Sequence, residues 1–210
     1  MWRRILLLSL LWLAPVLGWT APAPQPHVIL VMGDSLSAAY NIDPAQGWVN
    51  LLQQRLESSG YDYTVVNASI SGETTSGGLT RLPGALKEHG PGIVIIELGA
   101  NDGLRGLPLK VLHDDLTGMI LASERAGAKV LLVGMLLPPN YGGAYTQSFA
   151  QTYKDLARRY KLPFVPFLLR GIAENRDMMQ ADGLHPVAGA EPRVLENVWP
   201  YLEPLLHKKR

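Results

Sequence analysis

The chain has 210 residues, 47% of them hydrophobic, which is the size and composition of one globular domain with an ordinary core. Its 19 basic and 18 acidic residues give a net charge of +1, which excludes the strongly basic surface expected of a nucleic-acid-binding protein. The chain has no cysteine, and this excludes disulfide frameworks, thiolate metal sites and lipid attachment through a cysteine.

The first segment of the chain has the pattern of a secretory signal peptide. Arg3 and Arg4 precede an apolar run of about 13 residues, which is shorter than a membrane span. We predict a signal peptide over residues 1–21, with the start of the mature chain between 19 and 22, and a linker over residues 22–27; an uncleaved anchor is the alternative. The mature protein is then exported, to the periplasm or beyond, without a stable membrane anchor and with a net charge of about −1.

Beyond residue 27, apolar strand-like runs alternate with helical patterns. Strands are predicted at 28–32, 63–67, 93–98, 129–136 and 163–166, and helices at 46–58, 75–89, 109–126, 145–160 and 190–206. Continuous apolar strands between helices indicate an α/β fold, in which helices cover both faces of a parallel sheet. We place this domain at residues 28–206, with a basic tail at 207–210. His113 precedes two aspartates, but adjacent helix positions point to different faces, so we expect no metal site there.

Four polar blocks follow predicted strands or lie in a late loop. They are Gly33-Asp34-Ser35-Leu36-Ser37, Ser69-Ile70-Ser71-Gly72-Glu73, Gly99-Ala100-Asn101-Asp102 and Asp182-Gly183-Leu184-His185-Pro186. Because the carboxyl ends of parallel strands meet at one edge of a sheet, we expect these blocks to build one site. Their serine, imidazole and carboxylate are the components of Ser-His-Asp acyl transfer.

Each candidate residue also has a purely structural interpretation. Ser35 is either a nucleophile, for which it needs a general base, or the cap of a following helix. Asp182 either orients His185 or forms an Asx-turn, and the two roles are compatible. Gly72 is otherwise a turn glycine, and Asn101 is otherwise a loop cap.

The blocks G-D-S-L, the lone Gly72, G-A-N-D and D-G-L-H-P occur in the order of the GDSL/SGNH hydrolase superfamily, which the chain resembles from residue 28 to about 206. The resemblance is to the secreted thioesterase, esterase and lysophospholipase branch. It implies a flavodoxin-like three-layer fold with five parallel strands in the order 2-1-3-4-5. It also implies Ser35 as nucleophile, His185 as general base, Asp182 as its partner, and an oxyanion hole formed by Ser35, Gly72 and Asn101.

The resemblance further implies hydrolysis of aryl and alkyl esters, lysophospholipids and acyl-CoA through an acyl-enzyme. We expect a monomer that needs no metal or organic cofactor and contacts membrane lipid only transiently. Leu104, Leu137 and Leu184, with Tyr141 in the breaker-rich loop at 137–143, are predicted to bind the substrate. The alternatives are a carbohydrate O-acetylesterase of the same superfamily, a non-catalytic envelope lipid-binding protein and, with least support, a flavin-binding protein.

Overall fold

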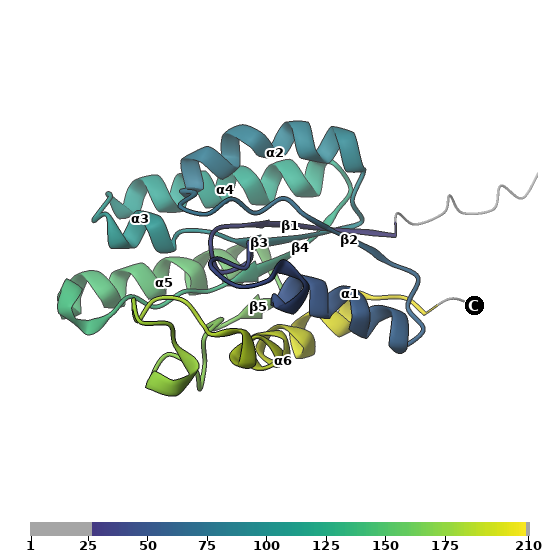
Figure 1. The fold of residues 1–210 in the computed structure, drawn as a ribbon. Coiled ribbons are helices and arrows are strands. Elements are labelled where there is room, and N and C mark those ends of the chain that lie inside the picture. Colours follow the sequence, from purple (N-terminus) through teal and green to yellow (C-terminus); the bar gives the residue numbers. More distant parts are fainter. Residues whose placement is uncertain (1–26, 209–210) are drawn as a thin grey trace, which may run out of the picture.

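A computed structural model describes residues 27–208 of the chain. It has a central sheet between two layers of helices (Figure 1). The signal peptide predicted at 1–21, the linker before residue 27 and the last two residues of the tail lie outside the described residues. Among residues 27–208, no helix combines the length and the apolar character that crossing a membrane requires.

The sheet consists of five parallel strands. They are β1 (Val28–Gly33), β2 (Thr64–Asn67), β3 (Ile93–Glu97), β4 (Lys129–Val133) and β5 (Phe164–Val165). Their order is β2-β1-β3-β4-β5, which confirms the predicted topology. Leu30 of β1 pairs with Val66 of β2 and Val94 of β3, so β1 lies between them. The central strands are buried on both faces, and this explains why their sequences are apolar without alternation.

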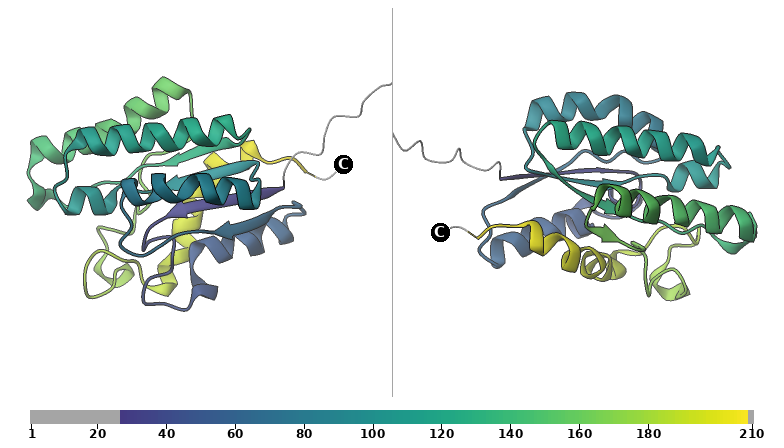
Figure 2. Two further views of the ribbon diagram at one scale, coloured as in Figure 1. Left: turned by 90° about the horizontal axis from the view of Figure 1, so that it is seen from above. Right: turned by 180° about the vertical axis from the view of Figure 1, so that it is seen from behind.

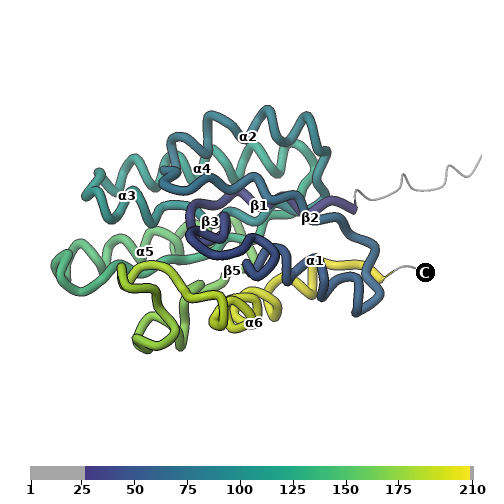
Figure 3. Tube along the Cα trace, viewed as in Figure 1, coloured from purple at the N-terminus to yellow at the C-terminus, as the bar shows by residue number. Residues whose placement is uncertain are grey.

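In the part of the chain that the structure describes, six α-helices flank the sheet. They are α1 (Trp48–Ser58), α2 (Thr75–His89), α3 (Ala100–Leu104), α4 (Leu109–Arg125), α5 (Gly143–Tyr160) and α6 (Glu191–Leu202). Helices α2 and α4 pack together on one face, and α1 and α6 pack together on the other (Figures 1 and 2). The described chain enters β1 and leaves after α6 at the same end of the molecule, opposite α3 (Figure 3).

Most predicted elements agree with the structure to within two residues, and three predictions were wrong. Strand β4 ends at Val133 rather than 136, because Met135 and Leu136, which continue the apolar run, line a cavity instead of continuing the strand. Helix α6 ends at Leu202 rather than 206, and a 3-10 turn containing Pro204 follows. The third polar block, predicted as a loop, begins the short helix α3.

Candidate active site

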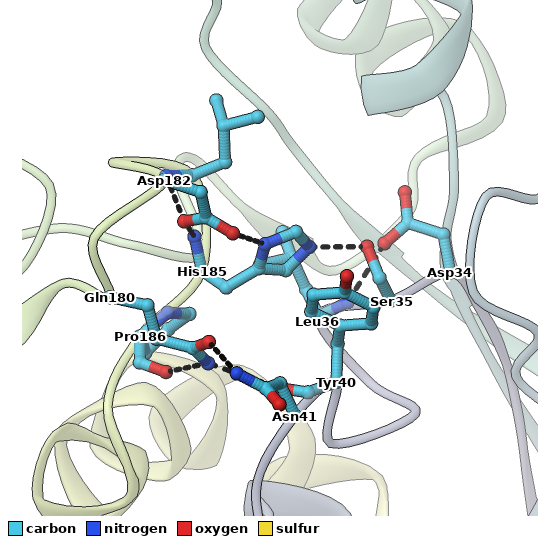
Figure 4. Close-up of polar contacts among 10 residues, drawn as sticks. Asp34, Ser35, Leu36, Tyr40, Asn41, Gln180, Asp182, His185 and Pro186 are labelled. Atoms are coloured by element: carbon cyan, nitrogen blue, oxygen red, sulfur yellow. Dashed lines mark hydrogen bonds and ion pairs between the residues drawn. The ribbon is translucent and has the colours of Figure 1, made fainter.

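Ser35 lies in the turn that follows β1. Residues 35–40 form turns rather than a helix, and the Ala38 N–H donates to the Asp34 carbonyl over 2.9 Å. The interpretation of Ser35 as a helix cap is therefore wrong. The Ser35 side chain is half-buried and points away from the core toward the loop that contains His185 (Figure 4).

His185 and Asp182 lie in a late loop that closes on itself through an antiparallel bridge between Met179 and Pro186. The distance from His185 Nδ1 to Asp182 Oδ2 is 2.7 Å, and that from His185 Nε2 to Ser35 Oγ is 2.8 Å (Figure 4). The other carboxylate oxygen of Asp182 accepts from the backbone N–H groups of Leu184 and His185. Asp182 thus forms the turn and contacts the imidazole at the same time.

The charge of Asp182 determines which nitrogen of His185 carries the proton. Burial raises the pKa of Asp182, but the hydrogen bonds donated by Leu184 N–H and by His185 outweigh it, so the pKa is lowered. A carboxylate can only accept, so His185 Nδ1 must donate to it. The unprotonated Nε2 then accepts from the Ser35 hydroxyl, which is the arrangement needed to remove the proton of that hydroxyl.

Gly72 lies in the loop after β2 in a left-handed conformation, with φ of 80°, where a glycine is favoured. The Ile70 N–H donates to the Gly33 carbonyl, so this loop lies beside the end of β1. Arg105 Nη2 donates to the Gly72 carbonyl over 2.9 Å. Within the described residues the backbone N–H groups of Gly72 and Ser35 donate no hydrogen bond, so both are free to bind a ligand.

Asn101 stands in the first turn of α3, directly after β3. Its side-chain amide donates to Asp34 Oδ2 over 3.1 Å, which ties it to the residue before Ser35. One amide hydrogen remains for another acceptor. Asp102, its neighbour, is buried and accepts from the N–H and hydroxyl groups of Thr75, which joins α3 to the start of α2.

Two buried carboxyl groups beneath Ser35 were not predicted as site residues. Asp34 accepts from the Leu36 N–H over 3.0 Å, and Glu97 accepts from the Ser37 hydroxyl over 2.6 Å and from the Asp34 N–H. Both side chains are fully buried. Burial raises the pKa of Asp34 to about 6, and burial together with the charge of Asp34 raises that of Glu97 well above its ordinary value. Glu97 could have been identified from the sequence, because it is the charged residue inside the otherwise apolar run at 93–98.

A cavity of about 340 Å³ opens beside Ser35. Its wall is mostly apolar and includes three of the four predicted substrate-binding residues, Leu104, Leu137 and Leu184. The fourth, Tyr141, is not part of the wall, because the loop after β4 borders the cavity only from Met135 to Pro139 and then turns into α5. The cavity suits an apolar chain attached to a group that Ser35 can reach.

His113 lies on α4 and contacts the adjacent Asp114 rather than a cluster of ligands. Across residues 27–208 no group of three or more histidine, aspartate and glutamate side chains is placed to hold a metal ion.

The chain matches known hydrolases over most of its length. Residues 31–189 match the model of the GDSL-like lipase/acylhydrolase family. Esterase TesA of Pseudomonas aeruginosa is 54% identical over 86% of this chain and 90% of its own. Thioesterase 1/protease 1/lysophospholipase L1 of Escherichia coli K12 is 38% identical over 90% of this chain and 89% of its own.

A solved structure agrees with these sequence matches. The psychrotrophic esterase EstA from Pseudoalteromonas sp., inhibited by monoethylphosphonate, superposes with a TM-score of 0.81 and 39% identity, covering 85% of this chain and 97% of that one. The family model matches more than half of the chain, and the two relatives are 54% and 38% identical to it over most of its length. The chain is therefore an ester hydrolase and belongs to the GDSL-like lipase/acylhydrolase family.

Proposed function

We propose that Ser35 is the nucleophile of this ester hydrolase. Its Oγ attacks the carbonyl carbon of an ester or thioester while His185 Nε2 takes the hydroxyl proton, and Asp182 stabilises the imidazolium that forms. The observation that carries this proposal is the chain of hydrogen bonds, 2.8 Å and 2.7 Å long, from Ser35 through His185 to Asp182 beside an apolar cavity.

The tetrahedral intermediate places negative charge on the former carbonyl oxygen. The backbone N–H groups of Ser35 and Gly72 and the remaining amide hydrogen of Asn101 are the donors that we assign to this oxygen. The intermediate collapses as His185 returns its proton to the leaving alcohol or thiol, and an acyl-enzyme remains on Ser35. His185 then deprotonates a water, whose oxygen attacks the acyl carbon. The bond between the acyl group and Ser35 Oγ breaks as His185 returns the proton to Oγ, and the carboxylic acid leaves.

We propose lipid-derived esters with one acyl chain, such as lysophospholipids, as the substrate class, with aryl esters and acyl-CoA as further substrates. The apolar cavity supports this class, because each methylene group that leaves water there contributes about 0.8 kcal/mol. A lysophospholipase is also named among the relatives.

Transient contact with membrane lipid is a further part of the proposal. Four exposed side chains, which we call the apolar rim, belong to the loops that form the site. They are Tyr40 beside His185, Leu136 and Leu184 in the cavity wall, and Ile70 in the loop whose backbone is hydrogen-bonded to the end of β1. They are four of the five large hydrophobic side chains exposed within residues 27–208. An apolar rim around a cavity favours contact with a lipid surface from which a single acyl chain can enter.

Binding to vesicles of phosphatidylcholine tests this contact. Ile70→Glu introduces a charge into the apolar rim and is expected to weaken sedimentation with the vesicles. Val111→Glu makes the same change at the fifth exposed hydrophobic residue, which lies on α4 outside the apolar rim, and is the matched control. Equal vesicle binding by wild type and both variants would exclude the rim as a lipid contact.

We also propose that the protein is exported after removal of residues 1–21 and acts as a monomer. The basic start and short apolar run of the sequence support export, and the single sheet supports one hydrolase domain over residues 28–206, between a linker at 22–27 and a tail at 207–210. Mass spectrometry of the protein purified from the periplasm and size-exclusion chromatography with light scattering test both statements.

The substrate class is tested with p-nitrophenyl esters of rising chain length, a lysophospholipid, palmitoyl-CoA and acetylated xylan, each with wild type and Ser35→Ala. We expect kcat/KM to rise about fourfold for each added methylene until the cavity is filled, and Ser35→Ala to abolish every activity. Preference for acetylated xylan would favour a carbohydrate O-acetylesterase. Binding of acyl chains without reaction toward a serine-directed phosphonate would favour a lipid-binding protein.

A further inference from the structure

The loop that contains Ser35 and the loop that contains His185 are about 150 residues apart in sequence and meet through three hydrogen bonds. One is the contact between Ser35 and His185 itself. The other two are both made by the side chain of Gln180, with the Tyr40 carbonyl at 3.0 Å and the Asn41 amide at 3.2 Å. Among the described residues, the hydrogen bonds that join the two loops apart from the contact between Ser35 and His185 therefore all involve the side-chain amide of Gln180.

Gln180 is itself fixed within the loop of His185. Its backbone N–H donates to the His185 carbonyl over 2.7 Å, and its side-chain Nε2 donates to the Pro186 carbonyl over 2.9 Å. The two hydrogens of Nε2 thus go to one carbonyl in each loop, and Oε1 accepts from Asn41. The side-chain amide of Gln180 therefore contacts both loops at once, with one hydrogen bond inside its own loop and two to the loop of Ser35 (Figure 4).

The segment that Gln180 holds has an unfavourable backbone conformation. Ala39 and Asn41 both have φ of 58°, in the left-handed region, which asparagine tolerates but alanine rarely adopts. This conformation presents the ring of Tyr40 to the imidazole of His185, with 4.5 Å between the ring centroids and 36° between the planes. A strained segment persists only where its surroundings hold it, and Gln180 supplies two of its contacts.

We infer that Gln180 and Tyr40 are positioning residues of the hydrolase. Gln180 sets the distance between the loops of Ser35 and His185, and the Tyr40 ring limits the orientation of the imidazole. The inference rests on the proposed roles of Ser35 and His185. A displacement of about 1 Å between reacting groups can lower a rate about 100-fold, so loss of this connection acts on catalysis rather than on substrate binding.

Gln180→Glu is the sharpest substitution, because it keeps the size of the side chain and the oxygen that accepts from Asn41. It replaces the amide nitrogen by an oxygen, which cannot donate to the carbonyls of Tyr40 and Pro186. We expect kcat for p-nitrophenyl butyrate to fall about 10- to 100-fold, with KM within about threefold of wild type.

Gln53→Glu is the matched control. Gln53 also joins distant backbone groups through its amide, donating to the Tyr63 carbonyl and accepting from the Val65 N–H, but it connects α1 with β2. We expect this variant to lower the melting temperature at least as much as Gln180→Glu while kcat stays at the wild-type value. Tyr40→Ala is expected to lower kcat about 10-fold, and Tyr40→Phe, which restores the ring, to recover it.

The inference is overturned if Gln180→Glu keeps kcat within twofold of wild type, or if Gln53→Glu lowers kcat equally at the same loss of melting temperature. Ser35→Ala in the same assays separates the two proposals. If Ser35→Ala remains active, the proposed nucleophile is wrong; if it is inactive while Gln180→Glu is fully active, only the positioning role is wrong.

Discussion

The loops that carry Ser35 and His185 meet beside the cavity but are held in different ways. In the first, Asp34 and Ser37 on either side of Ser35 are buried against Glu97 of the central sheet. In the second, Asp182, Gly183 and Leu184 are exposed, and the loop is fixed by hydrogen bonds within itself and through Gln180. The nucleophile is thus positioned by the core of the protein, and the base by a small number of polar contacts at its surface.

Because the two loops are held differently, substitutions in them should have different effects on folding and on activity. A change near Ser35 disturbs buried groups, so it affects folding as well as activity. A change in the loop of His185 affects few buried groups, so it can lower activity while stability is maintained. Variants on the two sides therefore separate catalysis from folding.

The largest expected effect comes from removing either member of the central pair. Ser35→Ala and His185→Ala should each lower kcat by roughly 10⁴-fold or more, because neither group works without the other. The double variant should lose no more than either single variant. Steady-state kinetics with circular dichroism as the folding control measure this; a double variant whose loss equals the product of the single losses would contradict a shared function.

The next largest effect concerns Asp182, on the exposed side. Its Oδ1 is fixed as an acceptor by two backbone N–H groups, so in Asp182→Asn the new amide nitrogen faces His185 Nδ1. The imidazole must then carry its proton on Nε2, toward Ser35, which is the wrong tautomer for a base.

We therefore expect Asp182→Asn to lower kcat by roughly 10³-fold and Asp182→Ala, which leaves the tautomer free, by about 10- to 100-fold. The melting temperature of Asp182→Asn should stay near that of wild type, because its Oδ1 can still accept from the two backbone N–H groups of the turn. If the alanine variant is the less active one, Asp182 does not act through the tautomer of His185.

Asn101 lies on the side of Ser35, where the neighbouring groups are buried, and a substitution there tests the proposed oxyanion donors. Asn101→Ala removes one proposed oxyanion donor and should lower kcat by roughly 10²- to 10³-fold with little change in KM, since the donor matters most in the transition state. It also leaves Asp34 Oδ2 without its partner, so the free energy of unfolding should fall by about 1–3 kcal/mol. Urea unfolding and steady-state kinetics measure the two effects. A rise in KM at constant kcat would assign Asn101 to substrate binding.

The central strands could be predicted from the sequence because they are buried on both faces, so their apolar residues run without interruption, and most of the predicted strand bounds agree with the structure. The strand order, which the structure confirms, was implied by the resemblance to the family and not by the apolar pattern. The error at β4 has the same origin, since Met135 and Leu137 continue the apolar run but line the cavity instead of the sheet. Apolar character indicates burial and does not distinguish a strand from a cavity wall.

The four polar blocks of the sequence predicted which side chains form the site, but they did not indicate the residues that hold those side chains in place. Gln180 and Tyr40 have ordinary neighbours in the sequence, and their contacts span 140 residues and more. Helix α3 was missed because it is one short turn that starts after a left-handed glycine, Gly99, and carries no apolar period. Such contacts depend on the tertiary fold, which local patterns do not encode.

The smallest expected effect concerns the pH dependence of stability and arises from a buried carboxyl group outside the two loops, that of Glu191. Glu191 begins α6, is buried, and accepts from the Trp48 N–H at the start of α1 over 2.8 Å. Burial raises its pKa from 4.5 to about 7, and the bond from Trp48 N–H only partly offsets this. The folded protein therefore holds a proton that the unfolded chain releases between these pH values.

The contribution of Glu191 to stability is consequently complete below about pH 4.5 and is lost as the pH rises through about 7. Glu191→Gln keeps an acceptor for Trp48 and cannot ionise, so stability should fall less between pH 5 and pH 8 than in wild type, by about 1–3 kcal/mol. Urea unfolding of both proteins at the two pH values measures this difference. Ester hydrolysis should be unchanged, because Glu191 contacts neither Ser35 nor His185; an identical pH dependence in both proteins would mean that Glu191 is ionised in the folded state throughout this range.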